Sequence, residues 1–369
     1  RLLLCCHGPA SGRDVAPSWH RGIHDLEGHI VKGTTVCLDA WNGFEAAAWV
    51  ENGRLEDLLI DSDLTRPGTI YRAIADRPVK GQGGMFVQTP DGMGFLRQVK
   101  GLSPGQSLLV QVTGYAEPGK AIPVTTKLLF KSRFAIVTPG APGLNVSRAI
   151  KDDAIRDRLL EIGHDILEGG QDGLILRSAC EFADLEAVAE DVTAMADLAQ
   201  AVLTDSAGGV EKLVEGPGPH DMAWREWPDQ GDVDGAPGAF ARHGVDDMIT
   251  ALQSSRIILA SGTMFVEPTR ALVAVDINTG GDTSPASGLK ANMAAAKDLP
   301  RQLRLRGLGG QITLDLAPMG KKDRRSFEAA LRAAFRRDMT ETALAGFTPL
   351  GHYELQRKRD RAPLLGGQK

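Results

Sequence analysis

The chain has 369 residues, 42% of them hydrophobic and 24% charged, with 43 glycines and a formal net charge of −5. This length is typical of two or three domains, and the composition excludes collagen-like, mucin-like and wholly disordered chains. The net charge gives no sign of nucleic-acid binding, although an acidic average can conceal a basic face.

The cysteines at positions 5, 6, 37 and 180 form no Cys-x-x-Cys pair. We therefore expect no zinc site and no disulfide framework, and we expect a reducing, cytoplasmic location. No apolar run reaches the length of about 18 residues that a membrane span needs, so we expect none. Residues 1–31 have neither strand nor helix periodicity, and we expect a poorly ordered extension ahead of a native start near Val31.

The part from 32 to 135 has the pattern of short strands separated by glycine and proline turns. Asn52-Gly53 and Asp91-Gly92 are hairpin signals. Such a series of strands predicts a small barrel of the OB type. Phe86 and Phe95 flank the second hairpin, where exposed rings would stack on bases; burial of both rings in the core is an equally good interpretation.

Helical spacing appears in the part from 136 to 243, with helices expected over 146–163 and 184–203 and a strand over 173–179. Residues 181–247 contain sixteen Asp or Glu against three Lys or Arg. We expect the Pro/Gly-rich segment 215–240 to be an acidic loop that repels other anionic chains.

The part from 244 to 369 predicts alternating helices and strands. We expect helices over 244–258, 288–308 and 321–339, a hairpin over 263–278 and a strand over 309–318. Residues 297–361 contain fifteen Lys or Arg against eight Asp or Glu, which places a polyanion site in this part of the chain.

Two acidic residues, Asp276 and Asp315, follow apolar strands that a helix of about twenty residues connects. Such a crossover predicts parallel strands, whose carboxyl ends meet at one edge of the sheet. Paired carboxylates beside a basic region suit Mg²⁺, or Mn²⁺, and phosphodiester hydrolysis, with Asn278 orienting a water or a ligand. The alternative is that both aspartates only cap or turn the chain.

A second group of residues suits a terminal phosphate. Arg177 and Ser178 follow the strand at 173–179, and Arg148 ends a glycine- and proline-rich loop. A guanidinium, a hydroxyl and loop amides together bind phosphate oxygens. A solvated arginine at a strand end is the alternative.

The segments SGTMFVEPTRALVAVDINTG and LPRQLRLRGLGGQITLDLAPM resemble the catalytic core of the ribonuclease E/G family of bacterial endoribonucleases. The resemblance extends from about Lys32 to Arg361. It implies a multidomain α+β fold with an S1/OB-type β-barrel and RNase H-like and DNase I-like α/β subdomains. The expected regions are the extension 1–31, the barrel part 32–135, the 5′-sensor and shortened RNase H-like part 136–243, and the DNase I-like catalytic part 244–369.

The resemblance also implies an activity, which is Mg²⁺-dependent hydrolysis of single-stranded RNA that leaves 5′-phosphate ends, in RNA decay or rRNA processing. It assigns metal binding to Asp276 and Asp315 with Asn278 beside them. It assigns RNA contact to Phe86 and Phe95, and 5′-phosphate binding to Arg177 and Ser178.

The sequence departs from the family pattern at several places. The Cys-Pro-x-Cys zinc link does not follow the core, so we expect no zinc and a homo-oligomer, if one forms, without that link. An insertion of the S1 domain is missing after residue 99, and Glu341 stands where a basic residue is expected. These departures keep two alternatives open, a non-catalytic RNA-binding protein and a Mg²⁺-dependent enzyme acting on a small phosphate ester.

Overall fold

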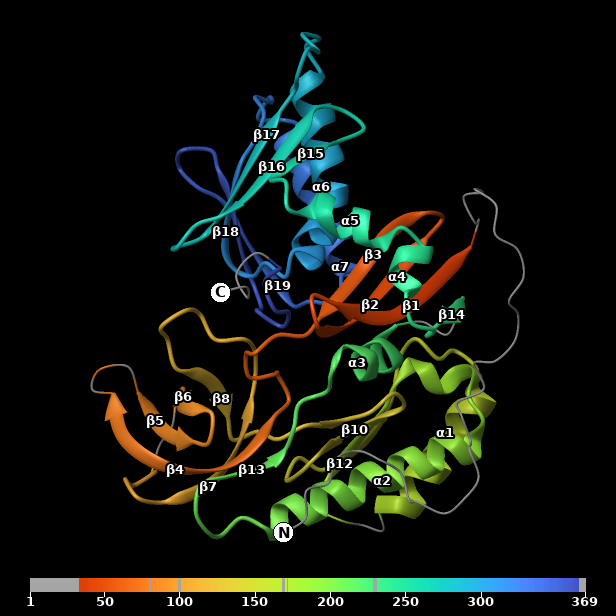
Figure 1. The fold of residues 1–369 in the computed structure, drawn as a ribbon, viewed down its shortest axis with the longest axis vertical. Coiled ribbons are helices and arrows are strands. Elements are labelled where there is room, and N and C mark those ends of the chain that lie inside the picture. Colours follow the sequence, from red (N-terminus) through yellow and green to blue (C-terminus); the bar gives the residue numbers. More distant parts are fainter. Residues whose placement is uncertain are drawn as a thin grey trace. The chain divides into compact units, whose positions relative to one another are not determined.

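The computed structural model describes residues 33–364 apart from residues 80, 82, 99, 100, 168, 169, 171 and 228–230. The extension expected over 1–31 lies outside the described residues. The described chain forms two compact units. Unit 1 comprises described residues 65–227, and unit 2 comprises 33–64 together with 231–364 (Figure 1). The first strands, which the prediction grouped with the barrel, therefore belong with the C-terminal part of the chain.

The first sheet of unit 2 is an antiparallel meander with one added parallel strand. Its order is β14-β1-β2-β3, and its bounds are β1 Thr34–Trp41, β2 Phe44–Glu51, β3 Arg54–Ile60 and β14 Asp232–Asp234. The turn between β2 and β3 has positive φ at both Asn52 and Gly53, as the hairpin signal predicts. Apolar residues of this sheet share a core with α4 (Ala239–Arg242) and α5 (Val245–Leu252).

The second sheet of unit 2 has six strands in the order β15-β16-β17-β18-β20-β19. The strand bounds are β15 Arg256–Ile258, β16 Thr263–Pro268, β17 Val273–Asn278, β18 Gly310–Asp315, β19 Thr342–Phe347 and β20 Tyr353–Arg357. Helices α6 (Ser287–Leu305) and α7 (Arg324–Arg336) bury their apolar residues against one face. The predicted crossover is confirmed, since α6 connects β17 to β18 and these two strands pair in parallel.

Unit 1 contains a closed five-stranded barrel. The strands β4 (Ile70–Val79) to β8 (Ile122–Thr125) follow the order β4-β5-β6-β8-β7, and β7 pairs back to β4. The intervening bounds are β5 Gly84–Thr89, β6 Gly92–Leu96 and β7 Ser107–Val112. A barrel of this kind fits an S1-like fold, as predicted.

The rest of unit 1 is a small sheet with helices. The sheet order is β11-β12-β10-β9, with β13 (Glu211–Val214) added to the barrel at β4. The sheet bounds are β9 Phe130–Lys131, β10 Ala135–Thr138, β11 Gly143–Val146 and β12 Gly173–Leu176. The helices are α1 Asp153–Leu167, the short 3₁₀ helix η1 Ser178–Phe182, α2 Leu185–Thr204 and α3 Pro219–Glu226. Assignment of this part as RNase H-like stays a prediction, as does the DNase I-like assignment in unit 2.

Several predicted elements have other bounds in the structure. Helix α1 does not end at Gly163 but continues to Leu167. The glycine instead permits close packing, because a Cβ at this position would lie 2.5 Å from Cδ1 of Leu144. The segment expected to be an acidic loop contains α3, β14 and the start of α4. The helix expected over 244–258 ends at Leu252, and Arg256–Ile258 is an edge strand. Strands β19 and β20 were not predicted.

Candidate active site

Asp276 and Asp315 lie directly opposite each other at the carboxyl ends of β17 and β18. Because strand residues alternate, the buried Val275 and Ile277 point into the core while Asp276 and Asn278 lie on the open face of the sheet. Neighbouring strands are about 4.8 Å apart, so the two carboxylates project side by side. The structure thus has the juxtaposition that the crossover predicts.

Two neutral or conditionally charged groups contact the aspartate pair. The amide Nδ2 of Asn278 donates a hydrogen bond of 2.7 Å to Oδ2 of Asp276. The ring Nδ1 of His352 lies 3.4 Å from Oδ1 of Asp315, whose side chain is 69% exposed. Within the described residues, neither aspartate forms an ion pair with a lysine or an arginine. Among the residues that the structure describes, the pair therefore lacks the lysine or arginine partner of a structural ion pair.

The donor set of this pair fits a magnesium ion better than a zinc ion. Adjacent carboxylates repel each other unless a cation lies between them. In the described part of the chain, no cluster of three or more His, Cys, Asp or Glu has metal-binding geometry. A structural zinc site needs four such ligands, whereas Mg²⁺ accepts one or two carboxylates and completes its shell with water and phosphate oxygens.

A buried asparagine, which the sequence analysis missed, holds the segment that follows Asp315. Asn292 on α6 is fully buried, donates through Nδ2 to the carbonyl of Ala317 at 2.8 Å and accepts from its amide at 3.0 Å. One turn earlier, Gly288 lies so close to Pro318 that a Cβ would be 1.8 Å from the Pro318 carbonyl oxygen. These contacts fix the chain where it leaves β18. An asparagine between the apolar residues of α6 was the available sequence signal.

Phe86 and Phe95 form a cross-strand pair on the outer face of the barrel. They lie opposite each other on β5 and β6, with ring centroids 5.4 Å apart. Both side chains are partly exposed, and the guanidinium of Arg77 lies 5.3 Å from the Phe86 ring centroid. Gly84 leaves room for the Phe95 ring. Neither ring belongs to the buried barrel core.

The three residues predicted to bind a 5′ phosphate follow the paired ends of two adjacent parallel strands, β11 and β12. The guanidinium of Arg177 donates to the carbonyls of Ser132, Arg133 and Arg225 and to Oε2 of Glu226 at 2.7 Å. Ser132 and Arg133 lie between β9 and β10, whereas Arg148 follows β11 on the other side of β12. Arg148 and Ser178 are exposed. Phosphate binding by these residues stays a prediction.

Comparison with known proteins matches the family described as "Ribonuclease E/G family" to residues 130–217 and 229–360. These two segments cover more than half of the chain, and the second contains Asp276, Asn278 and Asp315. The chain belongs to the ribonuclease E/G family. This confirms the resemblance that the strand-end motifs indicated.

Named relatives in the ribonuclease E/G family match most of the chain. Ribonuclease G of Salmonella typhimurium is 27% identical over 381 residues, which cover 85% of this chain and 77% of that protein. Ribonuclease G of Escherichia coli strain K12 is 26% identical over the same shares. Ribonuclease E of Nostoc sp. is 25% identical, covering 88% of this chain and 57% of that protein.

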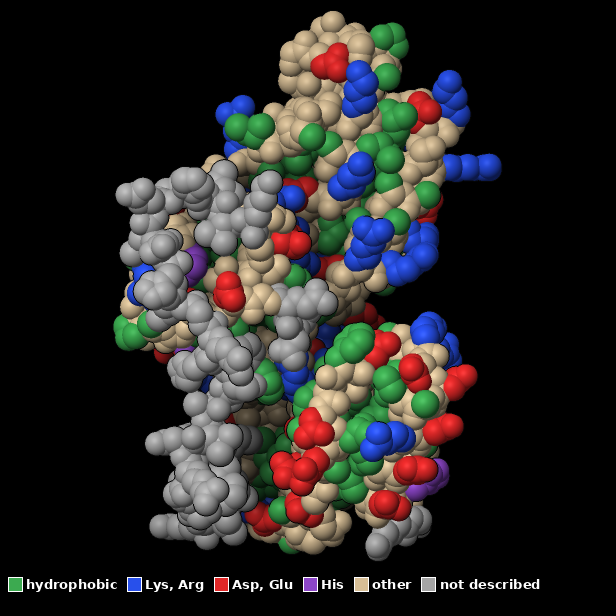
Figure 2. All heavy atoms as spheres, turned by 90° about the vertical axis from the view of Figure 1, so that its right-hand side faces the viewer, with side chains coloured by type: hydrophobic (Ala, Val, Ile, Leu, Met, Phe, Trp, Pro, Cys, Tyr) green, Lys and Arg blue, Asp and Glu red, His purple; other side chains and the backbone are tan. Residues whose placement is uncertain are grey.

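Charge is distributed unevenly in this ribonuclease E/G family member. On the face that Figure 2 views, Asp and Glu side chains predominate over the helices α1 and α2 of unit 1, and Lys and Arg side chains are numerous on unit 2. The sequence counts for 181–247 and 297–361 have the same signs. The basic segment 297–361 therefore belongs to the same unit as Asp276 and Asp315. No helix in the described ranges is long and apolar enough to cross a membrane.

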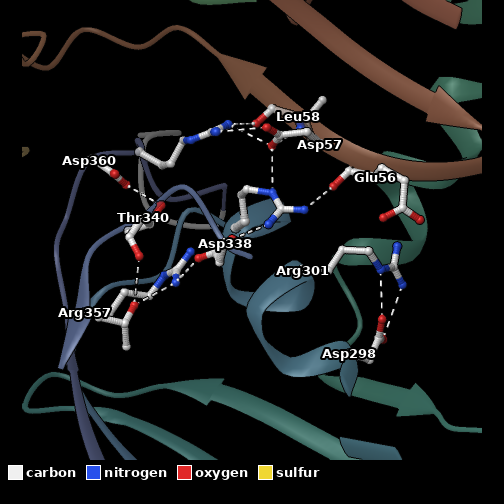
Figure 3. Close-up of polar contacts among 12 residues, drawn as sticks. Glu56, Asp57, Leu58, Asp298, Arg301, Asp338, Thr340, Arg357 and Asp360 are labelled. Carbon is white, nitrogen blue, oxygen red and sulfur yellow. Dashed lines mark hydrogen bonds and ion pairs between the residues drawn. The ribbon is translucent and has the colours of Figure 1, made fainter. Parts of the chain in front are cut away.

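A buried ionic network joins the two sheets of unit 2 (Figure 3). Asp57 on β3 is fully buried, and its carboxylate accepts hydrogen bonds from both terminal nitrogens of Arg361, at 2.9 and 3.0 Å. Arg304 on α6 contacts Asp57 and Asp338, and Arg357 on β20 donates to Asp338. These arginines belong to the basic part of the chain but their charges are neutralised inside the fold, so they are not free to bind RNA.

Proposed function

We propose that this protein is a Mg²⁺-dependent endoribonuclease that hydrolyses phosphodiester bonds in single-stranded RNA and leaves 5′-phosphate ends. The observation that carries the proposal is the register of β17 and β18, which sets Asp276 against Asp315 on an open face without a cationic partner in the described chain. Membership of the ribonuclease E/G family supports RNA as the substrate class.

Each side chain of the pair has a role in this proposal. Asp276 and Asp315 would hold the metal ion, and Asn278 orients Asp276 through its 2.7 Å hydrogen bond. When bound, Mg²⁺ polarises the phosphoryl oxygen and lowers the pKa of water. Water loses a proton as its oxygen bonds to phosphorus in line, the bond from phosphorus to the 3′ oxygen breaks, and a proton is returned to that oxygen. The products are a 5′-phosphate and a 3′-hydroxyl.

The barrel supports the choice of a single-stranded substrate. The Phe86–Phe95 pair presents two rings on the second and third barrel strands, where oligonucleotides bind barrels of the OB type. Arg77 on the first barrel strand adds a cation beside the Phe86 ring. Stacking on such rings contributes about 1–3 kcal/mol per base and does not require a particular sequence.

Substitution of the aspartate pair tests the proposal. We expect Asp276→Asn and Asp315→Asn each to lower Mg²⁺-dependent cleavage of a single-stranded RNA by about 100-fold or more, a barrier increase of roughly 3 kcal/mol. Glu267→Gln is the matched control, because Glu267 is an exposed carboxylate on β16 of the same sheet. Gel analysis of 5′-labelled RNA gives the rate, and circular dichroism checks the fold.

Full activity in both aspartate variants would contradict the proposal. Tight RNA binding without Mg²⁺-dependent cleavage by the unaltered protein would instead favour an RNA-binding protein without efficient catalysis.

A further inference from the structure

A row of four side chains crosses the open face of the six-stranded sheet. The strand register sets Arg256 on β15 opposite Phe265 on β16. Phe265 in turn lies opposite Asp276 on β17, which lies opposite Asp315 on β18. A cation, an aromatic ring and two carboxylates therefore follow one another on four adjacent strands.

All four side chains lie on the same face. Their strand neighbours Ile257, Met264, Val275 and Leu314 are buried in the core that α6 and α7 cover. Since side chains alternate along a strand, Arg256, Phe265, Asp276 and Asp315 point away from that core. Arg256, Asp276 and Asp315 are exposed, and Phe265 is partly exposed.

Phe265 is an apolar ring in polar surroundings. Thr263 and Glu267 precede and follow it on its face, and Asp276 lies opposite it. No aromatic pair or cation–π contact in the described chain includes this ring. Its backbone is about 5 Å from that of Asp276, one strand spacing. The ring is thus placed to stack on a base next to a phosphate that a metal ion on the two aspartates would bind.

The guanidinium of Arg256 has no hydrogen bond or ion pair among the described residues. Only the backbone amide of this residue has a side-chain partner, since it donates to Oγ of Ser254. Other arginines of unit 2, such as Arg301, Arg304 and Arg361, bond carboxylates or carbonyls. An exposed arginine two strands from Asp276 suits a phosphate of the RNA backbone.

We infer that this row is a nucleotide-binding track, in which a base flanking the scissile phosphate stacks on Phe265 while a neighbouring phosphate binds Arg256. The inference rests on the proposed nuclease function for the position of the scissile phosphate. The alternative for Arg256 is protection of the edge strand β15 against pairing with another chain, which predicts no effect on RNA.

Fluorescence of 2-aminopurine tests the track without catalysis. Short U-rich oligoribonucleotides carry this base at one position each and are titrated with protein in EDTA, so that no metal-dependent cleavage occurs. We expect quenching at a position that stacks on Phe265. Phe265→Val removes the ring and keeps a strand-forming side chain, and it should abolish that quenching and weaken binding about tenfold. Phe265→Trp should restore both.

Arg256→Gln provides a second readout with its own control. It should lower the slope of log affinity against log salt concentration by about 0.7, the effect of one lost phosphate contact on single-stranded RNA. Arg270→Gln removes an exposed arginine from the turn at the far end of the same hairpin and should leave the slope unchanged.

The outcomes separate the track from the nuclease proposal. Quenching that depends on Phe265 supports the track even if the unaltered protein cleaves nothing. No quenching at any position, or equal quenching with Phe265→Val, overturns the track even if the aspartate variants lose cleavage. An unchanged salt slope in Arg256→Gln removes Arg256 from it.

Discussion

At the scale of single residues, the environment of each carboxylate in unit 2 separates stability from chemistry. Asp57 and Asp338 are fully buried and each contacts arginines, so they neutralise charge within the fold. Asp276 and Asp315 are exposed, adjacent and without such partners in the described chain. Two adjacent carboxylates repel each other unless a cation lies between them, so this arrangement is typical of a cation-binding site.

Glu226 in unit 1 is, like Asp57, a buried carboxylate with cationic partners, and it predicts how stability depends on pH. Burial alone would raise the pKa of this carboxyl, but Lys131, Arg177 and Arg225 outweigh burial and lower the pKa from 4.5 to about 2. A carboxyl with a depressed folded pKa stabilises the fold above its unfolded pKa and loses that contribution as pH falls. Glu226→Gln should therefore lower the free energy of unfolding by about 3 kcal/mol at pH 7.

The size of this effect should shrink between pH 4.5 and pH 2, where the carboxyl of the folded protein becomes protonated. Urea unfolding of both proteins across this range measures it, and Glu190→Gln at an exposed position on α2 is a control. A stability difference that stays constant down to pH 2 would contradict the assignment.

The residue scale is where the sequence was least informative. Asp276, Asn278 and Asp315 could be predicted because short apolar strands end on them. The partners of Arg177 could not, because Ser132 and Glu226 are distant in sequence and meet it only through tertiary packing. His352 was missed for the same reason, since β20 pairs with β18 although α7 and β19 lie between them in the sequence.

At the scale of elements, the β17-α6-β18 crossover brings Asp276 and Asp315 together, and its helix positions the segment after Asp315. Long periodic segments such as α6 and α2 were predicted closely, because an apolar stripe over many residues is a strong signal. Short elements such as β15 and α3 were not, because they contain too few turns or alternations to reveal a period.

Asn292 tests the positioning role of α6. Asn292→Ala leaves the amide and carbonyl of buried Ala317 without partners, so we expect a loss of about 2–4 kcal/mol in the free energy of unfolding. At temperatures where the variant is folded, we also expect weaker Mn²⁺ binding, which a purely structural role would not produce. The hydrogen bond from Asn278 to Asp276 should remain in the Asn292→Ala variant, because Asn292 forms a hydrogen bond with neither residue.

Chemical denaturation gives the stability change, and Mn²⁺ titration followed by electron paramagnetic resonance gives the affinity. Asn145→Ala, at an exposed position on β11, is the matched control. Unchanged stability and affinity in Asn292→Ala would remove this helix from the account of the site.

At the scale of the whole molecule, the two units have separate apolar cores. The buried core residues of unit 1 lie between Ile70 and Val202. Those of unit 2 lie before Ile60 or from Ala239 onward. The sequence could not reveal that unit 2 is discontinuous, because hydrophobic periodicity reports local faces and not which distant segments share a core.

Separate cores predict two calorimetric transitions. Asp57→Asn removes a charge that Arg304 and Arg361 need, at a cost of about 3–5 kcal/mol, and should lower only the transition of unit 2. Glu226→Gln should lower only the transition of unit 1. Differential scanning calorimetry at pH 7 measures both. A single transition that both substitutions shift equally would show that the units unfold together.

The most direct test of the central claim is a crystal of the protein soaked in Mn²⁺ and measured at the manganese absorption edge. The account predicts an anomalous peak between the carboxylates of Asp276 and Asp315, and no such peak in Asp315→Asn. Carboxylates with no ion between them at saturating Mn²⁺, or a peak that persists unchanged in the variant, would contradict it.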